Sequence, residues 1–546
     1  MHSCPAAALA AFICVACGTL GSTQDGGGPA AEGATPDGAA LDASAPDVGA
    51  CDPLDHPPYA SPPYAGVHAG PGNNDLVACT AASAYAERWH ALKGLGVAQP
   101  NTFSPDGATI YVTTTQPTPE VCSLHALDAA TGEVHWCKAI LGAVGAAADV
   151  DTDGNLYVAA TGAVRSFRPD GTERWTFTLD AVDGEAAYGS HFGAAGLLVT
   201  ATSAGRLLLL DRADGHAAAS MDLLTTFGLA RPAPGTSLNL RDLLPEAVRI
   251  DMERVYGQGG ALLSVLGGAG AGYTDNTVAI GPDGTIYAIG WGVAAGKSAV
   301  VQVHVDVTPN GVSLRPGWRL DAVQNSASSP SVSPDGHWLK IEDGNTAAAL
   351  LAPQAFPATA RLADVSACDG NTDADPDPAV CEPALVLPLA SGPALGASPV
   401  LDDAEHYLWD VQLATLTRTE NPPDVSRYAG DTLVWATDLP EGAAFTSVLT
   451  LTRDAILGTM TRVTAGGTKL VGVALPETAE SELVVLDRET GAVRFHTPVS
   501  DDSTATVTIG PDGALYANLL GLVSAFAVQT EIVGGVVRFD PQQAGP

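Results

Sequence analysis

The sequence predicts an all-β fold, a single β-propeller of about eight four-stranded blades. Three observations predict it: a strand-and-turn unit recurs along the chain, Asp-Gly turns separate the strands, and glycine (60 residues) and proline (39 residues) are plentiful while aromatic residues are sparse. Many short strands joined by tight turns have this composition. The length of 546 residues exceeds that of an ordinary domain but suits a closed ring of repeated sheets.

The clearest repeat unit occupies residues 103–136. It begins with a Ser-Pro-Asp-Gly turn at 104–107, continues through predicted strands at 109–112 and 123–127, and ends with a turn at 128–132 and a strand containing Trp136. Related pieces recur near 153–175, 196–215, 282–318, 333–341, 398–435, 452–495 and 511–526. The Asp-Gly turns supply the positive φ that tight hairpins need.

The two ends of the repeat region indicate how the ring closes. A lone four-stranded sheet exposes two faces and two edges, so radial stacking and ring closure are needed to protect them. Residues 87–92 have the pattern of a final strand with no unit before it, and the last unit lacks a clear final strand of its own. We therefore expect an N-terminal strand to close the last blade.

The repeat carries a specific resemblance. The run Leu124, Asp128, Thr131, Gly132 and Trp136, with its spacing, resembles the repeat of quinoprotein (PQQ)-like β-propeller proteins, which include quinoprotein dehydrogenases and the barrel-assembly outer-membrane lipoprotein. A second good match lies at 485–491, and the resemblance covers residues 85–530. It implies a ring, usually of eight blades, in which the tryptophan packs between neighbouring blades. That packing role then falls to Trp89, Trp136, Trp175, Trp318 and Trp435.

The N-terminal region has the pattern of an export segment. Residues 5–16 are almost entirely apolar and too short to span a bilayer, which is typical of a signal peptide. The segment 1–17 ends at Cys17, in a context that resembles a bacterial lipobox, although Cys14 stands where Leu is preferred and no Lys or Arg precedes the apolar run. Lipidation at Cys17 is the first interpretation, and plain secretion with cleavage nearby is the alternative.

Three further segments follow. Residues 18–50 are mostly Gly, Ala, Pro, Ser and Asp, and such a composition predicts a disordered tether. Residues 51–84 form a lead-in, and residues 85–540 form the propeller. Two insertions are expected in the propeller: 223–277, with an amphipathic helix near 240–255 or a degenerate extra blade, and 353–397. Because Pro245 lacks a backbone N–H, we expect it in the first turn or before a shorter helix.

Six cysteines remain after those of the export segment: Cys51, Cys79, Cys122, Cys137, Cys368 and Cys381. An even number in an exported chain suggests three disulfide bonds. Pairing in sequence order is the economical choice among the 15 connectivities that six cysteines allow. None of the six forms a C-x-x-C pair, so zinc and redox motifs have no support.

The formal net charge is −36, from 61 acidic and 25 basic residues. Such a surface repels phosphate backbones and anionic lipids, so we expect no nucleic-acid partner and contact with a membrane only through an N-terminal lipid. The charge is also typical of a soluble surface with no binding role.

Two acidic loops are weak metal candidates. Asp149, Asp151, Asp153 and Asn155 alternate before and after a glycine in the manner of a calcium loop, but Ala160 stands where such a loop has a bidentate Glu. Asp369, Asn371 and Asp373 lie between Cys368 and Cys381 and offer a similar set of oxygens. Ordinary Asp-Gly or solvated turns explain both loops equally simply. Calcium is the one ion that the sequence leaves open, and no cofactor is expected.

No catalytic constellation is evident, so no catalytic residue is assigned. The resemblance would imply a quinone (PQQ) held beside calcium and two adjacent cysteines, but the chain has no adjacent cysteine pair and PQQ is not expected. We expect a non-enzymatic, monomeric binding or scaffolding propeller at the cell envelope, anchored to the outer membrane or cell surface, or else periplasmic or secreted, with an unknown envelope protein or ligand as partner. The alternatives are a quinone-dependent oxidoreductase or other channel-sited enzyme, and a surface adhesion or glycan-binding propeller.

Overall fold

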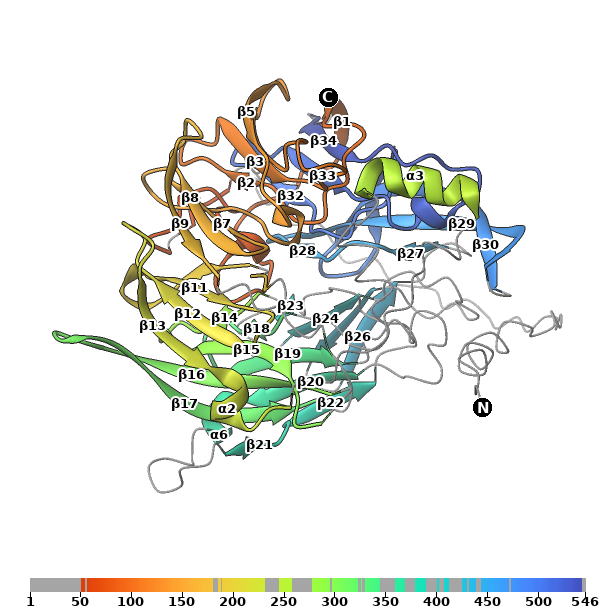
Figure 1. The fold of residues 1–546 in the computed structure, drawn as a ribbon. Coiled ribbons are helices and arrows are strands. Elements are labelled where there is room, and N and C mark those ends of the chain that lie inside the picture. Colours follow the sequence, from red (N-terminus) through yellow and green to blue (C-terminus); the bar gives the residue numbers. More distant parts are fainter. Residues whose placement is uncertain are drawn as a thin grey trace, which may run out of the picture.

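The computed structural model describes residues 51–54, 56–179, 185–187, 189–230, 245–257, 277–294, 297–322, 326, 329–343, 359–368, 379–388, 400–401, 407–411, 425–429, 432–437, 443–470 and 473–542. Within these residues the protein is mostly β, and its strands form several four-stranded antiparallel sheets (Figure 1). The predicted all-β class is therefore confirmed. Cys17, the tether and the loop residues Asp369, Asn371 and Asp373 lie outside the described residues.

The first four sheets follow one another along the chain. The first sheet contains β2 (Thr102–Phe103), β3 (Thr109–Thr113), β4 (Leu124–Asp128) and β5 (Val134–Lys138). The second contains β6 (Asp149–Val150), β7 (Leu156–Ala160), β8 (Ala163–Phe167) and β9 (Glu173–Thr178). The third contains β10 (His191–Phe192), β11 (Leu198–Ala201), β12 (Arg206–Leu210) and β13 (Ala217–Asp222). The fourth contains β14 (Ala279–Ile280), β15 (Ile286–Trp291), β16 (Ser298–Thr308), β17 (Gly311–Asp321) and a parallel edge strand, β21 (Val380–Cys381).

Four more sheets complete the set of eight in the described chain. The fifth contains β18 (Ser331–Val332), β19 (Trp338–Asp343), β20 (Thr359–Asp364) and β22 (Leu385–Pro388). The sixth contains β23 (Val400–Leu401), β24 (Tyr407–Val411), β25 (Val425–Ala429) and β26 (Thr432–Thr437). The seventh contains β27 (Ala443–Phe445), β28 (Thr450–Leu451), β29 (Ala455–Leu470), β30 (Val473–Asp487) and β31 (Val493–Val499). The eighth contains β32 (Thr508–Ile509), β33 (Leu515–Leu519), β34 (Gly535–Pro541) and β1 (Tyr85–Ala91).

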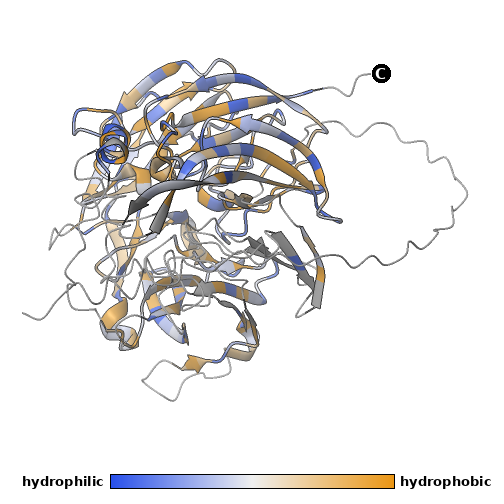
Figure 2. Ribbon diagram, turned by 90° about the vertical axis from the view of Figure 1, so that its right-hand side faces the viewer, coloured by the Kyte–Doolittle hydropathy of each residue, from blue (hydrophilic) through white to orange (hydrophobic). Residues whose placement is uncertain are grey.

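Within a sheet, residues become more exposed from the first strand to the fourth. The two residues of the first strands β2, β6, β10, β14, β18 and β32 are buried, whereas the outer strands β5, β13 and β31 alternate between exposed and half-buried residues. Figure 2 shows hydrophobic residues along the stacked strands, with hydrophilic residues between them. The first strands therefore lie in the interior and the fourth strands face solvent.

The apolar core lies between successive sheets. One cluster joins Phe103 and Ile110 of the first sheet to Leu457 of the seventh and to Leu515 and Val537 of the eighth. Other clusters join the first three sheets, the third with the fourth, and the fourth with the fifth. Each of these sheets thus buries its faces against its neighbours, which a lone sheet cannot do.

The strand expected at residues 87–92 is β1, and it pairs antiparallel with β34. Tyr85 lies opposite Pro541 and Ala91 opposite Val536, with one irregularity between Glu87 and Trp89. The first strand of the repeat region therefore belongs to the same sheet as the last.

The two expected insertions differ in structure. The described part of 223–277 is helical, with α2 (Leu223–Phe227) and α3 (Glu246–Tyr256), and Pro245 caps α3. The segment 353–397, by contrast, contributes β20, β21 and β22 to two sheets, together with the short helix α6 (Val365–Cys368). These strands were not predicted because the segment 353–397 shows little similarity to the repeat unit. None of the described helices is long and apolar enough to cross a membrane.

The three disulfide bonds follow sequence order, as predicted: Cys51–Cys79, Cys122–Cys137 and Cys368–Cys381. The second joins the approach to β4 with its antiparallel neighbour β5, in which Cys137 lies opposite His125. The first closes the lead-in into a loop.

Candidate functional site

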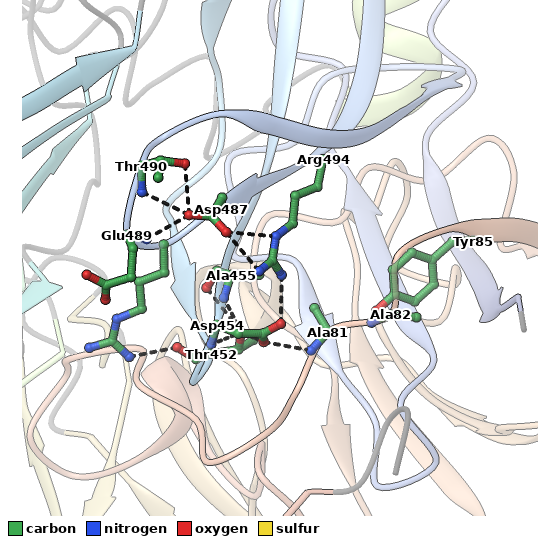
Figure 3. Close-up of polar contacts among 11 residues, drawn as sticks. Ala81, Ala82, Tyr85, Thr452, Asp454, Ala455, Asp487, Glu489, Thr490 and Arg494 are labelled. Atoms are coloured by element: carbon green, nitrogen blue, oxygen red, sulfur yellow. Dashed lines mark hydrogen bonds and ion pairs between the residues drawn. The ribbon is translucent and has the colours of Figure 1, made fainter. Parts of the chain in front are cut away.

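The Asp, Thr and Gly of the repeat build its outer turn. Asp487 Oδ1 accepts hydrogen bonds from the backbone N–H (2.9 Å) and hydroxyl (2.8 Å) of Thr490, and Arg494 donates to Asp487 Oδ2 (Figure 3). Asp128 and Thr131 form the same pair of bonds in the first sheet. The Thr hydrogen bonds stabilise the ionised carboxylates and lower the pKa of Asp128 and Asp487. The Asp and Thr side chains of the motif therefore stabilise the turn through hydrogen bonds within it.

The glycine of the same turn receives a tryptophan from the preceding sheet. A Cβ atom at Gly171 would lie 2.8 Å from the Trp136 ring, and one at Gly215 would lie 2.5 Å from Trp175. The indole N–H groups donate to Pro169 (2.8 Å) and Arg212 (3.0 Å) of those next sheets. Trp435 packs on Gly491 in the same way, and Trp318 lies in the apolar cluster between the fourth and fifth sheets.

Trp89 forms this contact between the last sheet and the first. A Cβ atom at Gly132 would lie 2.8 Å from its ring, and its indole N–H donates to Ala129 O at 3.2 Å. Arg538 of β34 also donates to Ala129 O, at 2.7 Å. The eighth sheet therefore contacts the turn of the first sheet as the first, second and sixth sheets contact their successors.

The lead-in occupies the centre, where the first strands converge. Its backbone forms hydrogen bonds with five of these strands: β2 (at Phe103), β6 (Val150), β14 (Ile280), β18 (Val332) and β28 (Leu451). Its partner residues include Tyr64, Ala60, Ala65, Pro71, Gly72, Asp75 and Val77. The Tyr59 hydroxyl reaches a sixth first strand, β10, at His191 Nδ1 (2.6 Å). One segment between Cys51 and Cys79 thus forms hydrogen bonds with strands of six different sheets.

Side chains of the lead-in make a buried polar network with these strands. Asn73 Nδ2 donates to the carbonyl groups of Val278 (3.0 Å) and Pro330 (3.0 Å), and His191 Nε2 lies 2.7 Å from Asn73 Oδ1. Burial, and then the neighbouring His68, lowers the pKa of His191 to about 3, so its ring is neutral. If the neutral ring carries its proton on Nε2, it donates a hydrogen bond to Asn73, and its Nδ1 accepts a hydrogen bond from the Tyr59 hydroxyl.

Three buried residues of the same region, Ser329, His68 and Asp75, are arranged like a serine–histidine–aspartate catalytic triad. His68 Nδ1 lies 2.8 Å from Asp75 Oδ2, and Ser329 Oγ lies 3.2 Å from His68 Nε2. Asp75 and Ser329 are 0% exposed, and His68 is 7% exposed. His68 and Asp75 also have positive φ values of 57° and 49°, which L-residues rarely adopt. This group could not be recognised from the sequence, because His68 and Ser329 are 261 residues apart.

The structure does not bring the first set of metal candidates into one cluster. The buried Asp149 carboxylate accepts from Ser190 Oγ, and burial raises its pKa. Asp151 instead accepts from Asn155 Nδ2, the Tyr157 hydroxyl (2.8 Å) and two backbone N–H groups, and it pairs with Arg212. Asp153 lies on the exposed turn. Another group with ligand atoms close enough for a metal, Asp211, Asp214 and His216, lies on an outer turn and is largely exposed.

A pocket of about 690 Å³ opens beside the lead-in. Its floor is formed by lead-in residues, among them His56, Asn74 and Ala78. Its walls are the turns at 192–194, 280–284 and 332–334, together with Arg453 and Arg488. Arg453 pairs with Asp52, and Arg488 donates to Thr452 O at 2.7 Å. A pocket of this size suits a small ligand or a partner's loop, and repeat reasoning could not find it because the lead-in carries no repeat.

Comparison with known proteins points to one family of repeats. The family model described as outer membrane protein assembly factor BamB matches residues 73–232. No curated protein matches the sequence.

Two solved structures resemble the chain at low sequence identity. Quinohemoprotein alcohol dehydrogenase from Comamonas testosteroni is 10% identical, with a TM-score of 0.50 over 88% of this chain and 81% of that chain. BamB from Moraxella catarrhalis is 10% identical, with a TM-score of 0.44 over 84% of this chain and 99% of that chain. At such identities only the fold is shared. Over residues 73–232 the chain thus matches a model of this repeat family, and its likeness to the dehydrogenase shows a shared fold.

Proposed function

We propose that the chain is a closed propeller of eight blades that serves as a non-enzymatic binding or scaffolding module at the cell envelope. The eight sheets and the Trp89 contact with Gly132 support the ring. The export segment, the lipobox-like Cys17 and the three disulfides support an exported, lipid-anchored protein. The match to the BamB family model favours a protein partner in the envelope.

The observation that carries the proposal is the occupied centre. A quinone or another channel substrate would need the space that Tyr59, Tyr64, His68 and Asn73 fill, and these side chains are buried there. A ring with its centre filled offers its turns and the 690 Å³ pocket as binding surfaces. We expect the partner to enter this pocket between the lead-in and the turns.

Site-specific photo-crosslinking in the producing cell tests this proposal. A photoreactive residue at Ala78 or Ala194, which line the pocket, should yield one discrete crosslinked partner. The same residue at Val493, which is 50% exposed on β31, is the matched control and should not. An identical product from Val493, or none from the pocket positions, would contradict a partner site in the pocket. In parallel, the purified protein should neither bind PQQ nor oxidise alcohols with it.

A hydrolase is the second candidate because of the relay formed by Ser329, His68 and Asp75. A fluorophosphonate probe labels an activated serine covalently, and labelling that disappears in Ser329→Ala would favour this function. Since Ser329 is 0% exposed beneath the lead-in, the scaffold proposal expects no labelling.

A further inference from the structure

A second buried polar cluster lies in loops beside helix α3, away from the lead-in. Asp501 and Asp502 are adjacent between β31 and β32, and both are 0% exposed. One oxygen of each carboxylate accepts two backbone N–H groups, from residues 533–534 for Asp501 and from 523–524 for Asp502, at 2.6–3.0 Å. Both side chains are therefore fixed in orientation.

The other oxygens of this cluster lack partners. Asp501 Oδ1, Asp502 Oδ2 and Ser524 Oγ are buried and accept or donate no hydrogen bond within the described structure. Ser524 is 1% exposed, and its hydroxyl lies beside the Asp501 carboxyl group. The backbone of Gly521 also approaches Asp501, because a Cβ atom there would lie 3.4 Å from Asp501 Oδ1. The oxygens of Asp501, Asp502 and Ser524 thus lie in one small buried region.

The charges in this region are unbalanced. Among the described residues, no basic side chain forms an ion pair with Asp501 or Asp502. The nearest helix, α3, contributes the Tyr256 hydroxyl, which lies 2.9 Å from Leu520 O and 2.8 Å from Gly521 O. Buried carboxylates without a counter-charge are costly, so a group that supplies positive charge to oxygen ligands is favoured here.

We propose that Asp501, Asp502 and Ser524 bind one Ca²⁺ ion. Carboxylate, hydroxyl and carbonyl oxygens in an irregular set suit Ca²⁺, whereas Mg²⁺ demands near-octahedral geometry and retains water. The ion would join the loop after β31 to the loop between β33 and β34, because Ser524 lies in that second loop and residues 533–534 directly precede β34, the partner of β1. It would thereby strengthen the sheet that contains both ends of the repeat region.

Thermal unfolding of the purified full chain, stripped with EDTA and then given 1 mM Ca²⁺ or Mg²⁺, tests the site. Ca²⁺ should raise the Tm of the wild-type protein by about 3 °C. Asp502→Asn keeps an acceptor for the backbone N–H groups but removes the charge, so it should abolish the Ca²⁺ response. Without metal, this variant should be at least as stable as the wild type, because an unbalanced buried charge is gone.

Two further variants separate the metal site from a purely structural role. Ser524→Ala removes only one hydroxyl and leaves the backbone N–H bonds to Asp502 in place, so it should fold normally and bind Ca²⁺ at least about 5-fold more weakly by calorimetry. Asp149→Asn is the matched control, since Asp149 is equally buried and has its own unpartnered oxygen; it should keep the response. The proposal is overturned if the wild type ignores Ca²⁺, if Mg²⁺ acts equally, or if Asp502→Asn and Ser524→Ala bind Ca²⁺ as the wild type does.

Discussion

At the scale of single residues, the repeat motif acts through pairs that span two sheets. The glycine of each outer turn has a positive φ, for example 79° at Gly171, and it leaves room for the indole ring of the preceding sheet. The motif could be predicted from the sequence because its residues lie within one short run. The buried network of the lead-in could not, since His191 lies 118 residues from its partner Asn73.

Gly171→Ala should destabilise the protein by roughly 2–4 kcal/mol, because the methyl group would meet the Trp136 ring and the backbone would be strained. Gly162→Ala is the control: Gly162 has a similar φ of 74° but nothing within 4 Å, so it isolates the backbone strain. Urea unfolding of both variants measures the difference. Equal losses would mean that the Trp–Gly contact contributes nothing.

His191 should make the stability depend on pH. Its folded pKa of about 3 is below its unfolded value of 6.5, so the unfolded chain gains a proton first as the pH falls. Its contribution is present above pH 6.5 and declines below it by about 1.4 kcal/mol per pH unit. His191→Gln should therefore lose less stability than the wild type between pH 6.5 and pH 5. Parallel curves for the two proteins in urea unfolding would refute this.

At the scale of elements, the lead-in is a central structural element and not a surface segment. Its length and its two cysteines were visible in the sequence, but its position was not, because it has no repeat pattern and its partners belong to distant strands. Strands with a strong repeat, such as β3 and β4, matched their predicted ranges within one residue at each end. Strands β20 and β22 were missed for the opposite reason, since their repeat is degenerate.

The Cys51–Cys79 bond should stabilise this element specifically. It closes a loop over a sequence separation of 28 residues, so its removal should cost roughly 3–4 kcal/mol. The double variant Cys51→Ala/Cys79→Ala should also be cleaved faster within 56–78 in limited proteolysis. The matched variant Cys122→Ala/Cys137→Ala should lose stability without this local cleavage. If both variants are cleaved there at the same rate, the bond does not hold the lead-in.

At the scale of the whole molecule, the eighth sheet is built from both ends of the repeat region and contacts the first sheet. The sequence indicated about eight units, and it placed residues 87–92 in the last sheet, where β1 pairs with β34, because those residues look like a final strand with no unit before it. The buried carboxylates at 501–502 carried no sequence signal, since their backbone partners come from loops 21 to 33 residues away.

Trp89→Ala tests whether the contact between the eighth and first sheets contributes as much stability as a contact between two sheets that follow each other along the chain. Trp89 and Trp136 make equivalent contacts with the next glycine and carbonyl group, so both alanine variants should cost roughly 2–4 kcal/mol. Urea unfolding compares the two directly. A loss below about 0.5 kcal/mol for Trp89→Ala alone would indicate that the ring is open at this point.

Hydrogen–deuterium exchange of the purified protein tests the occupied centre most directly. The amides of Ala60 and Val77 donate to Val150 and Leu451 in the interior, at 2.9 Å each. Peptides covering 56–79 should therefore exchange as slowly as those of β7 and β33. If these peptides exchange within seconds, as exposed loops do, the lead-in does not fill the centre and a channel-sited function becomes the better account.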